Sequence, residues 1–120
     1  MTEDIRNDIH EEKRPWGSFR RFTQNASTTV KIIEILPGES LSLQTHRHRG
    51  EFWRIIGGSG IVEINGNRSE AVKGAEFFIP TQATHRAIAQ EETLEILEIA
   101  IGDFDENDIE RLEDKYGRIA

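Results

Sequence analysis

The stretch Gln44-Thr45-His46-Arg47-His48-Arg49-Gly50-Glu51 places two imidazoles, a carboxylate and an amide within eight positions. In an extended strand, side chains alternate between two faces, so Gln44, His46 and His48 share one face. The short segment that follows can reverse the chain, so that Glu51 begins a return strand directed at the same point. A pocket of this composition suits a borderline divalent ion such as Zn, Mn, Fe, Co or Ni.

Histidines two positions apart on an exposed strand are often only solvated, so the pair alone is weak evidence for a metal. Further features favour metal binding. Gly38 and Gly58 flank the stretch, Glu51 follows it closely, and His85 lies in a second polar segment after Pro80. We therefore expect one divalent metal ion as cofactor.

The composition narrows the class of protein. The chain has 120 residues, enough for one domain, 1–120, with a core of its own. It contains no cysteine, which excludes disulfides, thiolate zinc sites and cysteine nucleophiles. A net charge of −7 argues against nucleic acid and anionic membrane as partners. No signal peptide or transmembrane segment is evident, so we expect a cytoplasmic protein.

Short segments with strand periodicity alternate with turn residues along most of the chain. The predicted strands cover residues 19–22, 29–36, 41–46, 51–56, 61–64, 68–72, 76–79, 85–89 and 94–101. Asn65-Gly66 is typical of a two-residue hairpin turn. We expect strands 41–46 and 51–56 to pair with each other.

The two ends of the chain differ from this pattern. Residues 1–13 are polar and predict a loose or partner-dependent N-terminal arm, which a turn at 14–18 follows. Residues 105–116 predict a short C-terminal helix, with Asp105 as its N-cap. Many short strands and one late helix indicate an all-β protein, either a small antiparallel barrel or a double-sheet jelly roll.

The glycine and ligand spacings resemble the two motifs of the cupin family. Gly38, Glu51 and Gly58 match the first motif, with Gln44 and His46 at its two histidine positions, and Gly74, Pro80 and His85 match the second. Gln82 and Ala89 depart from the second motif. The resemblance implies a cupin double-stranded β-helix, a jelly-roll barrel, whose metal ligands are Gln44, His46, Glu51 and His85.

Gln-x-His at the first ligand positions is similar to the metal site of phosphomannose isomerases. Further matches to the type II phosphomannose isomerase domain lie within residues 14–18, 37–44, 46–53, 79–80, 85–86 and 108–118. Thr84 and Arg54 depart from the pattern of that domain. In many relatives the domain follows a mannose-1-phosphate guanylyltransferase domain, which is absent here, so we expect no nucleotidyl transfer.

This resemblance implies that the chain interconverts mannose 6-phosphate and fructose 6-phosphate with the help of the metal. His48 is the candidate base, because it lies near the metal and titrates near neutrality, although a surface histidine at a hairpin is an equal alternative. The residues that the resemblance offers for the phosphosugar are Arg14, Lys31, Arg49, Trp53 and Arg86. Arg86 is also a candidate catalytic residue, although it directly follows His85 and should point to the other face unless a bulge re-aims it.

Two other classes of function stay open. One is another metal enzyme on the same scaffold, such as a dioxygenase or an epimerase; Gln44 argues against a dioxygenase. The other is a non-catalytic sugar- or metal-binding cupin. The apolar strand 94–101 could contribute to a homodimer.

Overall fold

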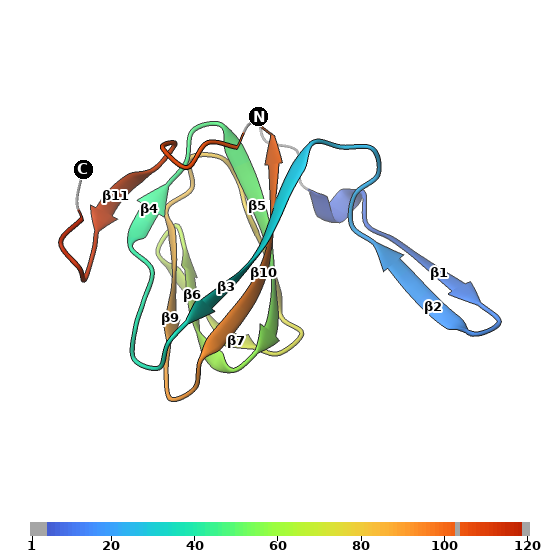
Figure 1. The fold of residues 1–120 in the computed structure, drawn as a ribbon, viewed down its shortest axis with the longest axis horizontal. Helices are drawn as coiled ribbons and strands as arrows, with labels where there is room; N and C mark the ends of the chain where they lie inside the picture. The colour runs from blue at the N-terminus through green and yellow to red at the C-terminus, as the bar shows by residue number, and fades with distance from the viewer. Residues whose placement is uncertain (1–4, 103, 119–120) are drawn as a thin grey trace.

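Nearly all the regular structure of the domain is β-strand (Figure 1). The computed structural model describes residues 5–102 and 104–118. Within these ranges the helical structure is one 3₁₀ turn, η1 (Ile5–Asn7). No helix among the described residues is long and apolar enough to cross a membrane. The all-β prediction is therefore confirmed.

One sheet has four antiparallel strands in the order β3-β10-β5-β8. Its strands are β3 (Thr28–Ile35), β10 (Leu94–Gly102), β5 (Arg49–Gly57) and β8 (Glu76–Ile79). β-Branched residues are frequent in β3, as expected for a strand. The alternation of side chains sets the faces: Leu94, Ile96 and Ala100 of β10 are all buried.

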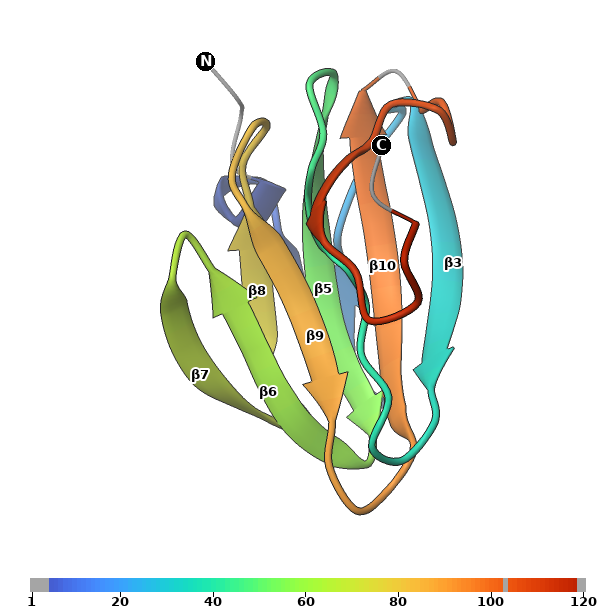
Figure 2. The same cartoon turned by 90° about the vertical axis from the view of Figure 1, so that its left-hand side faces the viewer.

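The second sheet has five antiparallel strands in the order β11-β4-β9-β6-β7. Its strands are β11 (Glu110–Glu113), β4 (Leu43–Thr45), β9 (His85–Ala89), β6 (Ser59–Ile64) and β7 (Asn67–Val72). The predicted hairpin is confirmed, since β6 and β7 pair around Asn65 and Gly66, whose φ angles are 49° and 81°. Figure 2 shows the two sheets facing each other as a jelly-roll barrel.

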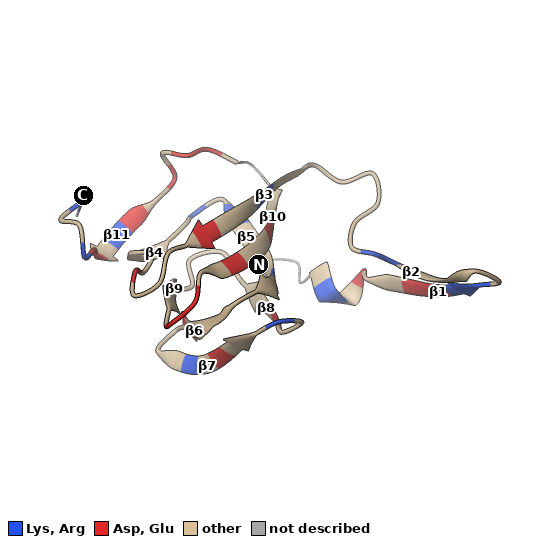
Figure 3. Ribbon diagram, turned by 60° about the horizontal axis from the view of Figure 1, so that its bottom comes forward, with Lys and Arg blue, Asp and Glu red and all other residues tan. Residues whose placement is uncertain are grey.

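The core fills the space between the sheets. Its buried members are Ile35, Trp53, Ile55, Val62, Ala71, Ile79, Ala83, Ala87, Ala89, Leu94 and Ile96. A smaller cluster joins Ile5 of the N-terminal segment to Phe52 and Ile99 on the outer face of the four-stranded sheet. Lys, Arg, Asp and Glu are interspersed over the strands of both sheets (Figure 3).

The N-terminal arm is ordered where the structure describes it. β1 (His10–Arg14) pairs with β2 (Gly17–Arg21) in a hairpin that projects from the barrel (Figure 1). The predicted turn at 14–18 lies at the tip of this hairpin. The polar composition predicted a loose segment, but pairing of β1 with β2 and burial of Ile5 order it. Residues 1–4 of the predicted arm lie outside the described residues.

The predicted C-terminal helix over 105–116 is wrong. Residues 110–113 form β11, which pairs with β4. Asp105 does accept a local hydrogen bond, from the Asn107 N–H, but in a turn rather than at a helix N-terminus. An exposed edge of β4 supplies backbone partners that the local pattern does not reveal, and they outweigh a weak helical preference.

The expected pairing of strands 41–46 and 51–56 is also wrong. β4 lies between β11 and β9, whereas β5 lies between β10 and β8 in the other sheet. The residues between them carry the chain from one sheet to the other instead of closing a hairpin. The consequence for the site is that Glu51 approaches the histidines from the opposite wall of the barrel.

Gly58 marks another crossing between the sheets, from β5 to β6. Its φ is 72°, and a Cβ built there would lie 1.9 Å from the Thr93 carbonyl oxygen. Real side chains do not approach a backbone atom so closely, so the crossing depends on the missing side chain.

We therefore expect Gly58→Ala to destabilise the domain more than Gly66→Ala. Both glycines have positive φ, which costs alanine about 1–2 kcal/mol, but nothing lies within 4 Å of a Cβ at Gly66. The backbone clash at Gly58 should add about 1–3 kcal/mol. Urea unfolding of the two variants measures this difference, and equal midpoints would contradict the argument.

Candidate metal centre

Three buried side chains from both sheets meet inside the barrel. His46 directly follows β4, His85 opens β9, and Glu51 comes from β5 in the facing sheet. The Nε2 atom of His46 lies 3.3 Å from Glu51 Oε2, and that of His85 lies 3.6 Å from Glu51 Oε1. Ligand atoms of all three residues lie within 4.8 Å of one another. Such a group can hold a divalent cation.

Both imidazoles are oriented for this role by backbone carbonyls. The Nδ1 atom of His46 is 2.6 Å from the Asp108 carbonyl oxygen, and that of His85 is 3.1 Å from the Ala83 carbonyl oxygen. Nδ1–H donates in each bond, which leaves the Nε2 lone pair to bind a metal. Burial lowers the pKa of His46, and it lowers the pKa of His85 to about 4, so both rings are neutral at pH 7.

Gln44 lines the same cavity. It is the β-sheet partner of His85, and its amide nitrogen donates to the carbonyl and hydroxyl oxygens of Ser42. These bonds occupy the nitrogen end of the amide, so the oxygen is the end left to act as a ligand. The four predicted ligands thus surround one space, and their imidazole, carboxylate and amide donors fit a divalent metal.

Glu98 is a site residue that the sequence prediction missed. It is 3% exposed, lines the cavity, and accepts a 3.2 Å hydrogen bond at Oε1 from Trp53 Nε1. Its Oε2 is buried without a hydrogen-bond partner among the described residues. Burial, followed by the charge of Glu51, raises the pKa of Glu98 to about 7. An acid on the otherwise apolar inward face of β10 was the signal available in the sequence.

Arg49 lies against the same group and is also buried. Its Nε donates to Glu51 Oε2 at 3.0 Å, one terminal nitrogen donates to the Asp105 carbonyl, and the other lies 3.2 Å from His46 Nε2. The guanidinium therefore contacts Glu51 Oε2 and His46 Nε2, two atoms that would bind a metal there. It stabilises the buried carboxylate, and it must give up its contact with His46 when an ion is bound.

The other predicted substrate residues divide between the cavity and the surface. Lys31 and Trp53 line the cavity, whose volume is about 310 Å³. Arg14 is exposed at the end of β1, where it pairs with Glu12. Arg86 is bonded to Glu63 and Glu113 and does not line the cavity. Its role in catalysis or phosphate binding stays a prediction.

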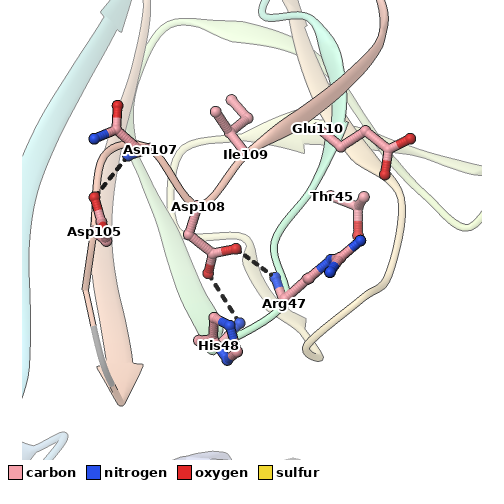
Figure 4. Close-up of a pocket in the computed structure, with 8 residues that line it drawn as sticks. All are labelled: Thr45, Arg47, His48, Asp105, Asn107, Asp108, Ile109 and Glu110. Atoms are coloured by element: carbon pink, nitrogen blue, oxygen red, sulfur yellow. Dashed lines mark hydrogen bonds between the residues drawn. The ribbon is translucent and has the colours of Figure 1, made fainter. Parts of the chain in front are cut away.

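His48 lies in a neighbouring hollow of about 660 Å³, shown in Figure 4. Asp108 accepts hydrogen bonds there from the backbone N–H groups of Arg47 and His48, each at 2.9 Å. The exposed His48 ring does not line the metal cavity, although Ile109 lines both spaces. His48, the base predicted from the sequence, therefore lies beside the candidate metal centre rather than within it.

Comparison with known proteins assigns this chain to a family. The family model described as the mannose-6-phosphate isomerase C-terminal domain matches residues 2–114. The mannose-1-phosphate guanylyltransferase ManC of Salmonella typhimurium is 36% identical, over 97% of this chain and 25% of that protein. The alginate biosynthesis protein AlgA of Pseudomonas aeruginosa is 39% identical, over 89% of this chain and 23% of its own length. The chain thus spans about a quarter of the length of these relatives.

Solved structures support the fold. A Klebsiella pneumoniae protein with a double-stranded β-helix domain has a TM-score of 0.64 at 17% identity, covering 76% of this chain and 78% of that one. A cupin protein from Bacteroides fragilis has a TM-score of 0.58 at 18% identity, covering 68% and 74%. Because the match spans nearly its whole length, the chain belongs to the family of mannose-6-phosphate isomerase C-terminal domains, which it builds on a cupin barrel.

Proposed function

We propose that this domain is a metal-dependent aldose–ketose isomerase that interconverts mannose 6-phosphate and fructose 6-phosphate. The observation that carries the proposal is the buried group of His46, Glu51 and His85, which faces a cavity with a further carboxylate. Membership of the isomerase family supports the reaction class, and the name of the relative ManC, a mannose-1-phosphate guanylyltransferase, supports a sugar phosphate as the substrate.

The proposed metal is one divalent ion, chosen from Zn, Mn, Co, Fe and Ni, with Gln44 beside His46, Glu51 and His85 as its ligands. When bound, such an ion supplies Lewis-acid stabilisation of the negative charge that develops on the sugar oxygens during isomerisation. The protein's part is to hold both imidazoles neutral, which their burial accomplishes, and to orient them, which their bonds to backbone carbonyls accomplish.

Isomerisation also needs a group that removes a proton from one carbon and returns it to the next. Glu98 suits this role better than His48, because its carboxylate faces the cavity and its Oε2 has no hydrogen-bond partner among the described residues. Trp53 holds the other oxygen, which keeps the carboxylate in place. Lys31, 3.6 Å from Oε2, favours the ionised form that acts as a base.

A second candidate function is non-catalytic binding of a phosphosugar. It is favoured by Arg49, whose guanidinium already bridges Glu51 and His46 and so neutralises the group without a metal. The two candidates differ in metal content and turnover. Elemental analysis, together with a coupled assay for fructose 6-phosphate in added Mn, Co or Zn, separates them.

The first prediction concerns the ligands. Glu51→Gln removes the one carboxylate of the group and should weaken metal binding by more than the roughly 10–100-fold that loss of an outer partner costs. His48→Gln is the control, since that ring is exposed outside the cavity. Metal content after purification and titration with Mn measures both. A Glu51→Gln protein that keeps its metal while His48→Gln loses it would reverse the assignment.

The second prediction concerns pH. An ordinary imidazole becomes protonated below about pH 6.5 and then cannot bind a metal. Because burial lowers the pKa of His85 to about 4, its ring should stay neutral well below that pH. Since the pKa of His46 is lowered as well, metal affinity should fall less between pH 7 and pH 6 than two ordinary imidazoles would allow, and it should fall steeply towards pH 4. Calorimetric titration across this range tests it, and a tenfold loss already at pH 6 would contradict the lowered pKa.

The third prediction concerns proton transfer. Glu98→Gln keeps the shape of the side chain but removes the base, so kcat should fall roughly 10²–10⁴-fold with metal content unchanged. Exchange of the C2 proton of the sugar phosphate with solvent should fall in parallel. Full activity in Glu98→Gln combined with its loss in His48→Gln would move the role to His48. A metal-replete protein with neither turnover nor exchange would exclude the isomerase.

A further inference from the structure

The cavity that holds the metal centre is rich in cations. Four cationic side chains line it, Lys31, Arg49, Arg111 and Arg118, against three carboxylates, Glu51, Glu98 and Glu106. This local excess of positive charge contrasts with the net charge of −7 of the whole chain. A concave site of one sign attracts ligands of the other, so the cavity is suited to an anionic ligand.

Three of these cations are already paired with carboxylates. Lys31 lies 3.6 Å from Glu98 and 3.7 Å from Glu106. Arg49 is bonded to Glu51, and Arg118 holds both oxygens of Asp114. A phosphate would have to displace one of these partners to use the cations fully.

Arg111 differs from the other three. Its side chain has no hydrogen bond or ion pair to any described residue, and its Nε is buried. Burying an N–H without a partner is unfavourable, and a bound acceptor would remove that penalty. Arg111 thus offers an unused donor and charge inside the cavity.

The sheet register sets the distance between Arg111 and the candidate metal ligand His85. Arg111 pairs with Gln44, and Gln44 pairs with His85, so the three residues form one row across β11, β4 and β9. Residues paired across strands point to the same face of a sheet. With neighbouring strands about 4.8 Å apart, Arg111 stands roughly 10 Å from His85 along this row. An extended hexose chain spans such a gap between its carbonyl end and a terminal phosphate.

We propose that Arg111 binds the phosphate of a sugar phosphate whose carbonyl end lies at the metal centre, which makes β11 the wall that selects phosphorylated sugars. This inference rests on the proposed function for the choice of ligand. The guanidinium suits the task because its planar donors match two phosphate oxygens at once. It also explains why the domain adds β11 to the sheet beside Gln44.

Binding measurements on the full, metal-loaded chain test this assignment independently of turnover. Calorimetric titration compares mannose 6-phosphate, inorganic phosphate and mannose for the unchanged protein and for Arg111→Gln, Arg111→Lys and Arg68→Gln. Arg68→Gln removes one charge from the exposed part of β7 and is the matched control. Arg111→Gln should weaken mannose 6-phosphate and phosphate about 10–100-fold, and Arg111→Lys should recover only part of the loss.

We also expect Arg111→Gln to keep its metal content and Arg68→Gln to bind mannose 6-phosphate with unchanged affinity. Unchanged affinity for mannose 6-phosphate in Arg111→Gln would overturn the inference, as would equal losses for mannose or loss of the metal. If the unchanged protein isomerises mannose 6-phosphate, the proposed function stands even when the phosphate site at Arg111 is refuted. Conversely, an inactive protein that binds mannose 6-phosphate through Arg111 would keep the phosphate site and refute the isomerase.

Discussion

The carboxylate of Glu51 is the constraint on which the interior of this barrel depends. It is 1% exposed, and an unpaired charge so deeply buried would be strongly unfavourable. Arg49 and Trp53 donate hydrogen bonds to it, and the two imidazoles of the opposite sheet stand close to its oxygens. The two sheets are therefore joined by a polar cluster set in an apolar core. Each buried polar group of the cluster depends on its neighbours for hydrogen bonds or ion pairs.

The segment after β10 shows how distant parts of the chain complete this cluster. Its Asp108 carbonyl oxygen holds the His46 ring, while its carboxylate accepts the N–H groups of Arg47 and His48. Burial acts to raise the pKa of Asp108, but these two backbone donors reverse the shift, so that the pKa is lowered overall. The ionised side chain thus stabilises the turn that carries His46 from β4 towards the centre.

Two different groups of side chains line the cavity at the two ends of the row formed by Arg111, Gln44 and His85. Neutral imidazoles and buried carboxylates lie at one end, where the candidate metal ligands meet. Arg111, whose charge is not matched by a carboxylate among the described residues, lies two strands away. Most of the ion pairs hold the fold, whereas the Oε2 of Glu98 and the Nε of Arg111 have no hydrogen-bond partner among the described residues and remain for a ligand.

The sequence by itself determined most strands of the barrel, because they depend on local periodicity, whereas the candidate metal ligands were predicted from the resemblance to the cupin motifs. The turn at Asn65-Gly66 follows from a local signal, while the facing of the two sheets brings Glu51 to His46 and His85. Only the tertiary structure decided that residues 110–113 form a strand, since β4 supplies its backbone partners from a distant part of the chain. It likewise decided which charged residues face the cavity. Arg86 and Arg111 are both arginines on strands, but ion pairs hold Arg86 outside the cavity, while the pairing of β11 with β4 brings Arg111 into it.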